Sequence, residues 1–215
     1  MGTVVLFGSQ KGGTGKTTAS TNTAAYLVLN GFDCILVDAD QQQSASTWAQ
    51  DRQENQQVTQ KVTRVSLSGS IRADLLDLKK RYQFVIVDCA GRDSRELRTG
   101  MTAADILFSP LRPSQYDLDT LPKLIEVYGQ AKDYNDSLRG YIVINQAPTN
   151  PSIRETQQAK SYIADYPELK IAKQVIHERK AFRDTASEGL SIFESSNKKA
   201  IEEFKSVIEE IILNG

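Results

Sequence analysis

A glycine-rich loop between an apolar run and a helical segment constrains the fold of this chain more than any other feature. The loop spans residues 8–18, Gly-Ser-Gln-Lys-Gly-Gly-Thr-Gly-Lys-Thr-Thr, and follows the β-forming run 3–7. Residues 19–30 are predicted to form a helix. In this order the glycines let successive N–H groups converge on one anion at a helix N-terminus. The order predicts a strand–loop–helix unit that binds phosphate groups.

Two side chains after the last glycine carry the chemistry of such a loop. Lys16 is predicted to contact the β- and γ-phosphates of a nucleotide, and the Thr17 hydroxyl to ligate Mg²⁺. The strict pattern G-x-x-x-x-G-K-[ST] is not met, because Gln10 stands at its first position. The alternative is a glycine-rich turn that binds nothing. The predicted nucleotide contacts of the loop are Lys11, Gly12, Gly13, Thr14, Gly15, Lys16, Thr17 and Thr18.

Three aspartates stand where apolar runs end. The run 32–37 leads into Asp38 and Asp40, and the run 84–87 leads into Asp88. Parallel α/β sheets place ligands at the carboxyl ends of their strands, so we expect these carboxylates beside the loop. Asp38 and Asp40 can hold water on Mg²⁺ and orient an attacking water, and Asp88 is expected to act on Mg²⁺ through water. Turn and helix-cap roles are the alternative for the first two.

Composition is that of an ordinary globular protein. The chain has 215 residues and a net charge of −1, so any nucleic-acid binding must come from a local patch. Cys34 and Cys89 lie in apolar runs and are interpreted as small buried side chains rather than as a disulfide or metal pair. No signal peptide or membrane span is evident, so we expect a cytoplasmic protein.

Apolar strands alternate with helical segments along the chain. This alternation predicts a three-layer α/β fold, with a mostly parallel β-sheet flanked by helices and right-handed crossovers. We expect one domain over residues 1–215. The predicted strands are residues 3–7, 32–37, 84–88, 105–110, 141–145 and 171–176, with a weaker one inside 58–67. Helices are expected at 70–81, 117–134, 152–165 and 196–213.

The last predicted helix, residues 196–213, has apolar residues at helical spacing. Its polar face carries four Glu and three Lys. A helix that targets a membrane surface is usually basic on that face. We therefore expect this helix to pack on the core of the protein.

These motifs resemble the deviant Walker-A ATPases of the ParA/MinD family, which have a P-loop NTPase fold. The resemblance covers nearly the whole chain and is strongest at residues 11–18, 38–48 and 179–194, with departures at Gln10, Gln41 and residues 89–91. It implies that Lys11 reaches across a homodimer to the partner's nucleotide. It also implies that Asp40 acts most directly in hydrolysis and that Asn145 recognises adenine. A turn-forming asparagine is the alternative for Asn145.

A basic segment lies within the last resemblance. Residues 170–183 contain five Lys or Arg and one acidic residue. Such a segment can bind DNA phosphates without reading bases. A solvated face is the alternative. The predicted DNA-binding residues are Lys173, Arg179, Lys180 and Arg183.

The resemblance implies a short ParA-type partition ATPase that lacks an N-terminal helix-turn-helix domain and associates with the nucleoid. With ATP and Mg²⁺ it is expected to form a dimer, or a longer polymer, on nonspecific DNA. A centromere-bound ParB-type protein is expected to stimulate a weak hydrolysis of ATP to ADP. The alternatives are an ATPase that positions a protein cargo and a nucleotide-dependent scaffold with little turnover. A redox ATPase is disfavoured, because both cysteines lie within predicted strands.

Overall fold

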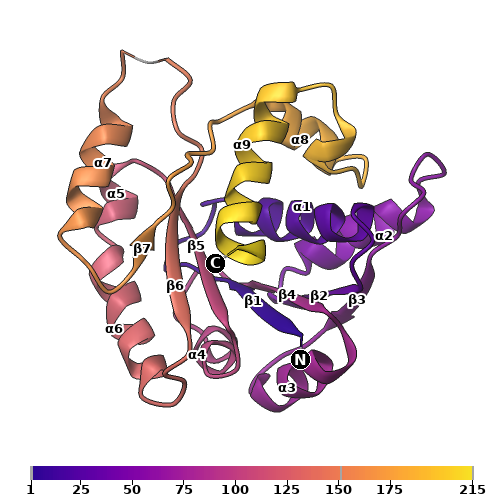
Figure 1. Ribbon diagram of the computed structural model, residues 1–215, viewed down its shortest axis with the longest axis horizontal. Coiled ribbons are helices and arrows are strands. Elements are labelled where there is room, and N and C mark those ends of the chain that lie inside the picture. Colours follow the sequence, from indigo (N-terminus) through magenta and orange to yellow (C-terminus); the bar gives the residue numbers. More distant parts are fainter. Residues whose placement is uncertain (1, 151, 215) are drawn as a thin grey trace.

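The structure is a computed structural model that describes residues 2–150 and 152–214. Its seven strands form one sheet in the order β3-β2-β4-β1-β5-β6-β7, with parallel pairing throughout (Figure 1). The strands are β1 Thr3–Phe7, β2 Cys34–Ala39, β3 Thr63–Ser66, β4 Phe84–Cys89, β5 Ile106–Leu111, β6 Arg139–Ile144 and β7 Lys170–Ile171. The predicted three-layer α/β fold is confirmed.

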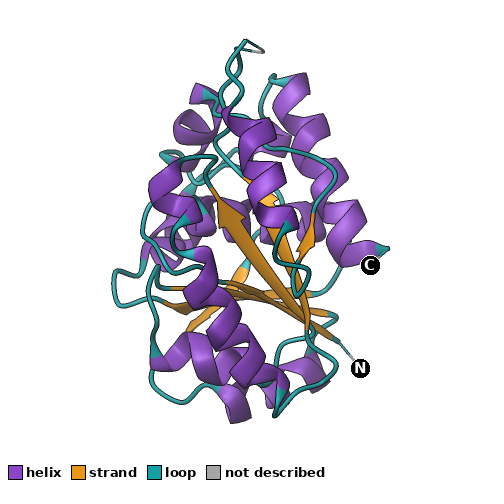
Figure 2. Cartoon of the chain, turned by 90° about the vertical axis from the view of Figure 1, so that its left-hand side faces the viewer, coloured by secondary structure: helices purple, strands orange, loops and turns teal. Residues whose placement is uncertain are grey.

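Helices cover both faces of the sheet (Figure 2). Helices α3, α4, α6 and α7 pack on one face, and α1, α2 and α9 on the other. The helices are α1 Lys16–Leu29, α2 Ser44–Glu54, α3 Arg72–Arg81, α4 Arg95–Met101, α5 Gln115–Leu118, α6 Leu121–Lys132, α7 Glu155–Ala164, α8 Lys180–Ala186 and α9 Lys198–Ile208. The central strands are apolar along their length because both of their sides are buried.

Burial determines the reactivity of the two cysteines. Cys34 in β2 and Cys89 in β4 are both buried and free. Burial raises the pKa of both thiols, so they stay protonated and inert at neutral pH. Their interpretation as small buried side chains is confirmed.

The single helix predicted over residues 117–134 is wrong in its first part. The chain forms the short helix α5 and then starts again as α6, which has Pro122 in its first turn. Proline has no N–H to donate to the preceding turn, but in a first turn that donor is not needed. Pro122 therefore favours a new helix start over a continuous helix.

The strand predicted over residues 171–176 is also shorter than expected. Only Lys170–Ile171 pairs with β6 as a strand, and an isolated bridge joins Ala147 to His177 further on. Between them the N–H of Lys173 donates to the Glu210 carboxylate, at 3.1 and 3.2 Å. On either side of Lys173, the N–H groups of Ala172 and Ile176 still donate to carbonyl oxygens of β6, at 2.9 and 3.0 Å.

The C-terminal segment packs on the core, as predicted. Helix α9 is followed by a π-helical turn, Glu209–Leu213, and both bury apolar side chains against α1 and the sheet. Phe204, Val207 and Ile211 are at most 1% exposed. Among the described residues, no helix combines the length and apolar character needed to cross a membrane.

Candidate functional site

The glycine-rich loop leaves the carboxyl end of β1 and enters α1 through two left-handed glycines. Gly13 has φ +76° and Gly15 has φ +91°, a region that other residues rarely adopt. A Cβ atom on Gly15 would lie 2.3 Å from Nδ2 of Asn145. The loop thus needs glycine at Gly15 both for its backbone angle and for contact with β6.

Lys16 points into this loop with its ammonium group buried. Nζ donates to Oγ of Ser9 at 3.1 Å and to the carbonyl of Lys11 at 3.0 Å, and neither acceptor is an anion. Burial lowers the pKa of Lys16, while the nearby Asp88 and Asp40 carboxylates raise it. A buried ammonium bonded only to neutral oxygens fits a phosphate ligand.

Thr17 and Asp88 meet beside the lysine. Oγ1 of Thr17 donates to Oδ2 of Asp88 at 2.7 Å. Oδ1 of Asp88 is buried and has no hydrogen-bond partner among the described residues. A hydroxyl and an unsatisfied carboxylate oxygen side by side are the ligand types that Mg²⁺ prefers, so these residues fit the predicted metal.

The other two aspartates lie at the same edge of the sheet. Asp38, in β2, is in register with Asp88 of β4. Its carboxylate accepts hydrogen bonds from the N–H of Asp40 at 3.1 Å and of Ser46 at 2.7 Å. Asp40 follows the strand and accepts from the N–H of Gln42 at 3.0 Å. Asp38 therefore shapes the loop that carries Asp40 and also fixes the first turn of α2.

The Asp88 carboxyl makes the unliganded protein sensitive to pH. Burial raises its pKa to about 7, and Asp38 adds to this, although Thr17 and Lys16 oppose it. Between the ordinary pKa of 3.8 and about 7, the folded protein keeps a proton that the unfolded chain has lost. Rising pH therefore favours unfolding across this window.

We expect the titration of Asp88 to lower the free energy of unfolding of the ligand-free protein by a few kcal/mol as pH rises from about 4 to about 7. Asp88→Asn carries no titrating proton and should lack this part of the slope. Urea unfolding of both proteins at a series of pH values measures it. An equal slope in the variant would contradict the assignment to Asp88.

The loop after β4 packs directly on the glycine-rich loop. A Cβ atom on Gly91 would lie 2.4 Å from the carbonyl oxygen of Lys11 and 2.6 Å from Nζ of Lys16. Only glycine allows this approach without displacing the lysine. Gly91 is therefore required where the loop after β4 meets the glycine-rich loop.

Lys11 faces its own chain in this structure. Its Nζ forms an ion pair with Oδ2 of Asp117 at 2.8 Å and lies 5.5 Å from the centre of the Tyr116 ring. Asp117 is 2% exposed, whereas Tyr116 is 79% exposed. The contact holds the lysine at the surface beside α5.

A cavity of about 490 Å³ opens on the other side of the loop. Nδ2 of Asn145 donates to the carbonyl of Thr14 at 2.7 Å, which joins the end of β6 to the loop. The structure thus brings Asn145 beside the predicted phosphate site, at the wall of a cavity. Its lining includes Gly15, Thr18, Arg112, Asn145, Phe182 and Arg183.

The predicted DNA-binding cations do not form an unopposed basic patch. Three pair with carboxylates: Arg179 with Glu203 at 2.5 Å, Arg183 with Glu178 at 3.0 Å and Lys180 with Asp184 at 3.1 Å. Arg179 and Arg183 also line the cavity, and Lys173 is exposed. Glu203 comes from α9, so a count over residues 170–183 missed it.

Arg112 and Phe182 are among the cavity residues that were not predicted from the sequence. Arg112 follows β5 at the edge of the sheet that carries the loop, and its guanidinium donates to the carbonyl of Gly13. Phe182, between two predicted DNA contacts, also lines the cavity. Arg112 stands directly after a buried strand, and this position could have identified it as a site residue, because ligands bind at the carboxyl ends of parallel strands.

Known proteins share this sequence pattern and fold. A family model described as the CobQ/CobB/MinD/ParA nucleotide binding domain matches residues 5–192. Maintenance of carboxysome distribution protein A of Gloeobacter kilaueensis is 30% identical, and the match covers 97% of this chain and 93% of that protein. The sporulation initiation inhibitor protein Soj of Bacillus subtilis is 24% identical, with 100% of both chains covered.

Two solved structures agree with the fold. Apo McdA from Cyanothece has a TM-score of 0.82 and 15% identity, with 97% of this chain and 99% of that chain covered. MinD from Pyrococcus horikoshii, complexed with Mg-ADP, has a TM-score of 0.72 and 19% identity, with 98% and 96% covered. These structures show the fold, and the matched domain together with the sequence relatives establishes that this chain belongs to the ParA/MinD family of P-loop ATPases.

Proposed function

We propose that the protein is an ATP-dependent partition ATPase that dimerises on ATP and binds DNA nonspecifically. The observation that carries the nucleotide part is the buried Lys16 ammonium, which is bonded only to neutral oxygens beside an unsatisfied oxygen of Asp88. An anionic phosphate and a cation would satisfy both groups. Membership of the ParA/MinD family supports the same ligands.

The proposed hydrolysis uses the residues at the edge of the sheet. The loop N–H groups and Lys16 bind the β- and γ-phosphates, and Thr17 and Asp88 hold the metal. Bound Mg²⁺ supplies positive charge against the phosphate oxygens. Asp40 orients the attacking water, while Asp38 holds the loop that carries Asp40. Asn145 binds the base at the cavity wall.

The proposed active form is a homodimer in which Lys11 contacts the partner's nucleotide. In that form the lysine has to leave Asp117, so the ion pair of the free chain opposes dimerisation until ATP is bound. We also propose that a ParB-type partner stimulates hydrolysis and that the protein associates with the nucleoid in the cytoplasm. Residues 1–215 are proposed to form a single ParA-like domain.

DNA binding is the part to test first. Binding to a nonspecific duplex is measured without nucleotide, with ADP and with ATP, at two salt concentrations. We expect tight, salt-sensitive binding only with ATP, since binding to phosphates releases counterions. Absence of DNA binding in every state, with ATP-dependent dimerisation intact, would contradict the partition function.

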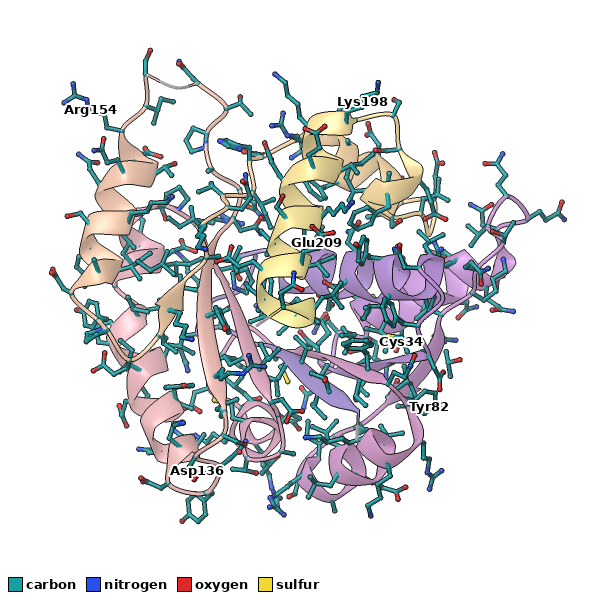
Figure 3. All side chains as sticks on the ribbon, viewed as in Figure 1. Cys34, Tyr82, Asp136, Arg154, Lys198 and Glu209 are labelled. Atoms are coloured by element: carbon teal, nitrogen blue, oxygen red, sulfur yellow. The ribbon has the colours of Figure 1, made fainter. Side chains whose placement is uncertain are left out.

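A charge-reversal pair locates the DNA surface. Lys173→Glu combined with Lys180→Glu should weaken ATP-dependent DNA binding by roughly 10-fold or more and reduce its salt dependence. Lys80→Glu is the control, because Lys80 is exposed at the end of α3, near Tyr82 and away from α8 (Figures 1 and 3). Equal binding by the double variant and the control would exclude these two lysines from the interface.

A second candidate function is the positioning of a protein cargo. It is favoured by the relatives named maintenance of carboxysome distribution protein A, of which the Halothiobacillus neapolitanus protein is 27% identical over 94% of this chain. Such an ATPase would share the nucleotide cycle proposed above. A partner that stimulates hydrolysis without binding a DNA site would favour this function over partition.

A further inference from the structure

Helix α2 is bonded to the turn that follows α8 through three successive backbone carbonyls. The donors are spaced three and four residues apart, so they lie on one face of α2 and its C-terminal cap. We call these three side chains the ladder. The ladder bonds run from Asn55 Nδ2 to Glu188 O at 2.8 Å, from Arg52 Nη1 to Gly189 O at 3.2 Å, and from Trp48 Nε1 to Leu190 O at 3.0 Å.

Arg52, the middle residue of the ladder, is held in place by an ion pair with Glu194. Arg52 is fully buried, and its guanidinium binds both carboxylate oxygens of Glu194, at 2.8 and 3.1 Å. Its Nε donates to the carbonyl of Gln60 at 3.0 Å. A bidentate pair fixes direction as well as distance, so Arg52 holds the turn in one orientation against α2.

The backbones of the two segments also touch. Gly189 has φ +65°, and a Cβ atom on it would lie 2.3 Å from the backbone nitrogen of Arg52. Residues other than glycine would push the turn away and break the ladder. Gly189 and Glu194 lie in residues 179–194, one of the segments that resemble the ParA/MinD family. Gly189 allows the close contact of the two backbones, and Glu194 pairs with Arg52.

The ladder connects the two ends of the candidate site. At one end α2 starts directly after the loop of Asp40, and Asp38 accepts a hydrogen bond from the N–H of Ser46 in its first turn. At the other end the turn follows α8, whose Phe182 and Arg183 line the cavity. Figure 1 shows α8 and its turn beside α1 and α2, on the side of α9.

We propose that Trp48, Arg52 and Asn55 are positioning residues of the nucleotide site. They hold α8 against the cavity and tie it to the loop that carries Asp38 and Asp40. The assignment rests on the proposed binding of nucleotide in the cavity. A loosened ladder lets α8 move away, so ATP binding weakens and α8 loses the protection that ATP gives it.

The test removes two ladder donors without leaving a buried charge unpaired. Trp48→Phe keeps an aromatic ring in place, and Asn55→Ala removes only a side-chain amide. For the double variant we expect roughly 10-fold weaker ATP binding in calorimetry with Mg²⁺, since two of the hydrogen bonds that hold the turn against α2 are lost. Hydrogen exchange of residues 180–190 should also be faster with ATP bound than in the wild type.

The control is Gln50→Ala, on an exposed position of α2 whose side chain bonds only to Glu54 among the described residues. It should bind ATP within about two-fold of the wild type, because no ladder bond is removed. If the double variant does not fold, Asn55→Ala alone is measured, with an expected loss of about three-fold.

The outcomes separate this assignment from the proposed function. A variant that unfolds at lower temperature but binds ATP as tightly as the wild type, with equal protection of α8, would overturn the positioning role. Failure of the wild type itself to bind ATP would instead overturn the proposed function. Weaker binding by the ladder variant, with Gln50→Ala unchanged, supports the assignment.

Discussion

Replacing Lys16 with methionine is expected to abolish ATP hydrolysis while leaving the ligand-free fold at least as stable. The ammonium group is buried, and burial lowers its pKa, which means that the charged form is disfavoured in the absence of a bound anion. Methionine is unbranched and only one atom shorter than lysine, and it removes the charge. Loss of the phosphate contact should lower the hydrolysis rate by roughly 100-fold or more.

Two properties of the variant check this result, its use of ATP and its stability. Turnover of ATP and calorimetric ATP binding report the lost contact, and thermal unfolding without nucleotide reports stability. Lys80→Met is the matched control, because it removes an exposed lysine and should change neither. A Lys16→Met protein that is clearly less stable would show that the buried charge has a partner within the protein. Continued ATP hydrolysis by this variant would contradict the phosphate contact of Lys16.

Removing Lys11 is expected to abolish ATP-dependent dimerisation. The single change Lys11→Met would leave the buried Asp117 carboxylate without its cation, at a cost of roughly 1–3 kcal/mol. The variant to make is therefore Lys11→Met combined with Asp117→Asn. Sedimentation with ATP and without it should detect only monomers.

Asp117→Asn alone is the matched control for this change. It removes the ion pair of 2.8 Å but keeps the lysine, which is then free to contact a second copy. We expect this variant to dimerise on ATP at least as readily as the wild type. If the double variant dimerised at the same ATP concentrations as the wild type, a contact between Lys11 and the partner's nucleotide would be excluded.

Local sequence predicted the central strands and the edge of the sheet at which the glycine-rich loop and the aspartates lie. The glycine-rich loop has to lie between β1 and α1, and Asp38 and Asp88 have to lie together, because parallel strands end at one edge of a sheet. The break before α6 was also encoded locally, in Pro122, but a stripe of apolar residues at helical spacing concealed it. The loop and the helix break depend on residues that are neighbours along the chain, whereas Asp38 and Asp88 meet because their strands are parallel and adjacent in the sheet.

Other features depended on partners far away in the sequence. Glu203 and Glu210 of the C-terminal segment contact the basic region and change its charge, and no count within residues 170–183 contains them.

The amino-acid sequence by itself determined the α/β layers, the phosphate loop and the three aspartates, because glycine geometry and apolar periodicity act over a few residues. Only the tertiary structure decided which charges meet. Lys11 and Asp117 are separated by 106 residues, and Arg52 and Glu194 by 142. Ion pairs of this kind form where packed layers bring side chains together, and local sequence patterns do not specify that packing.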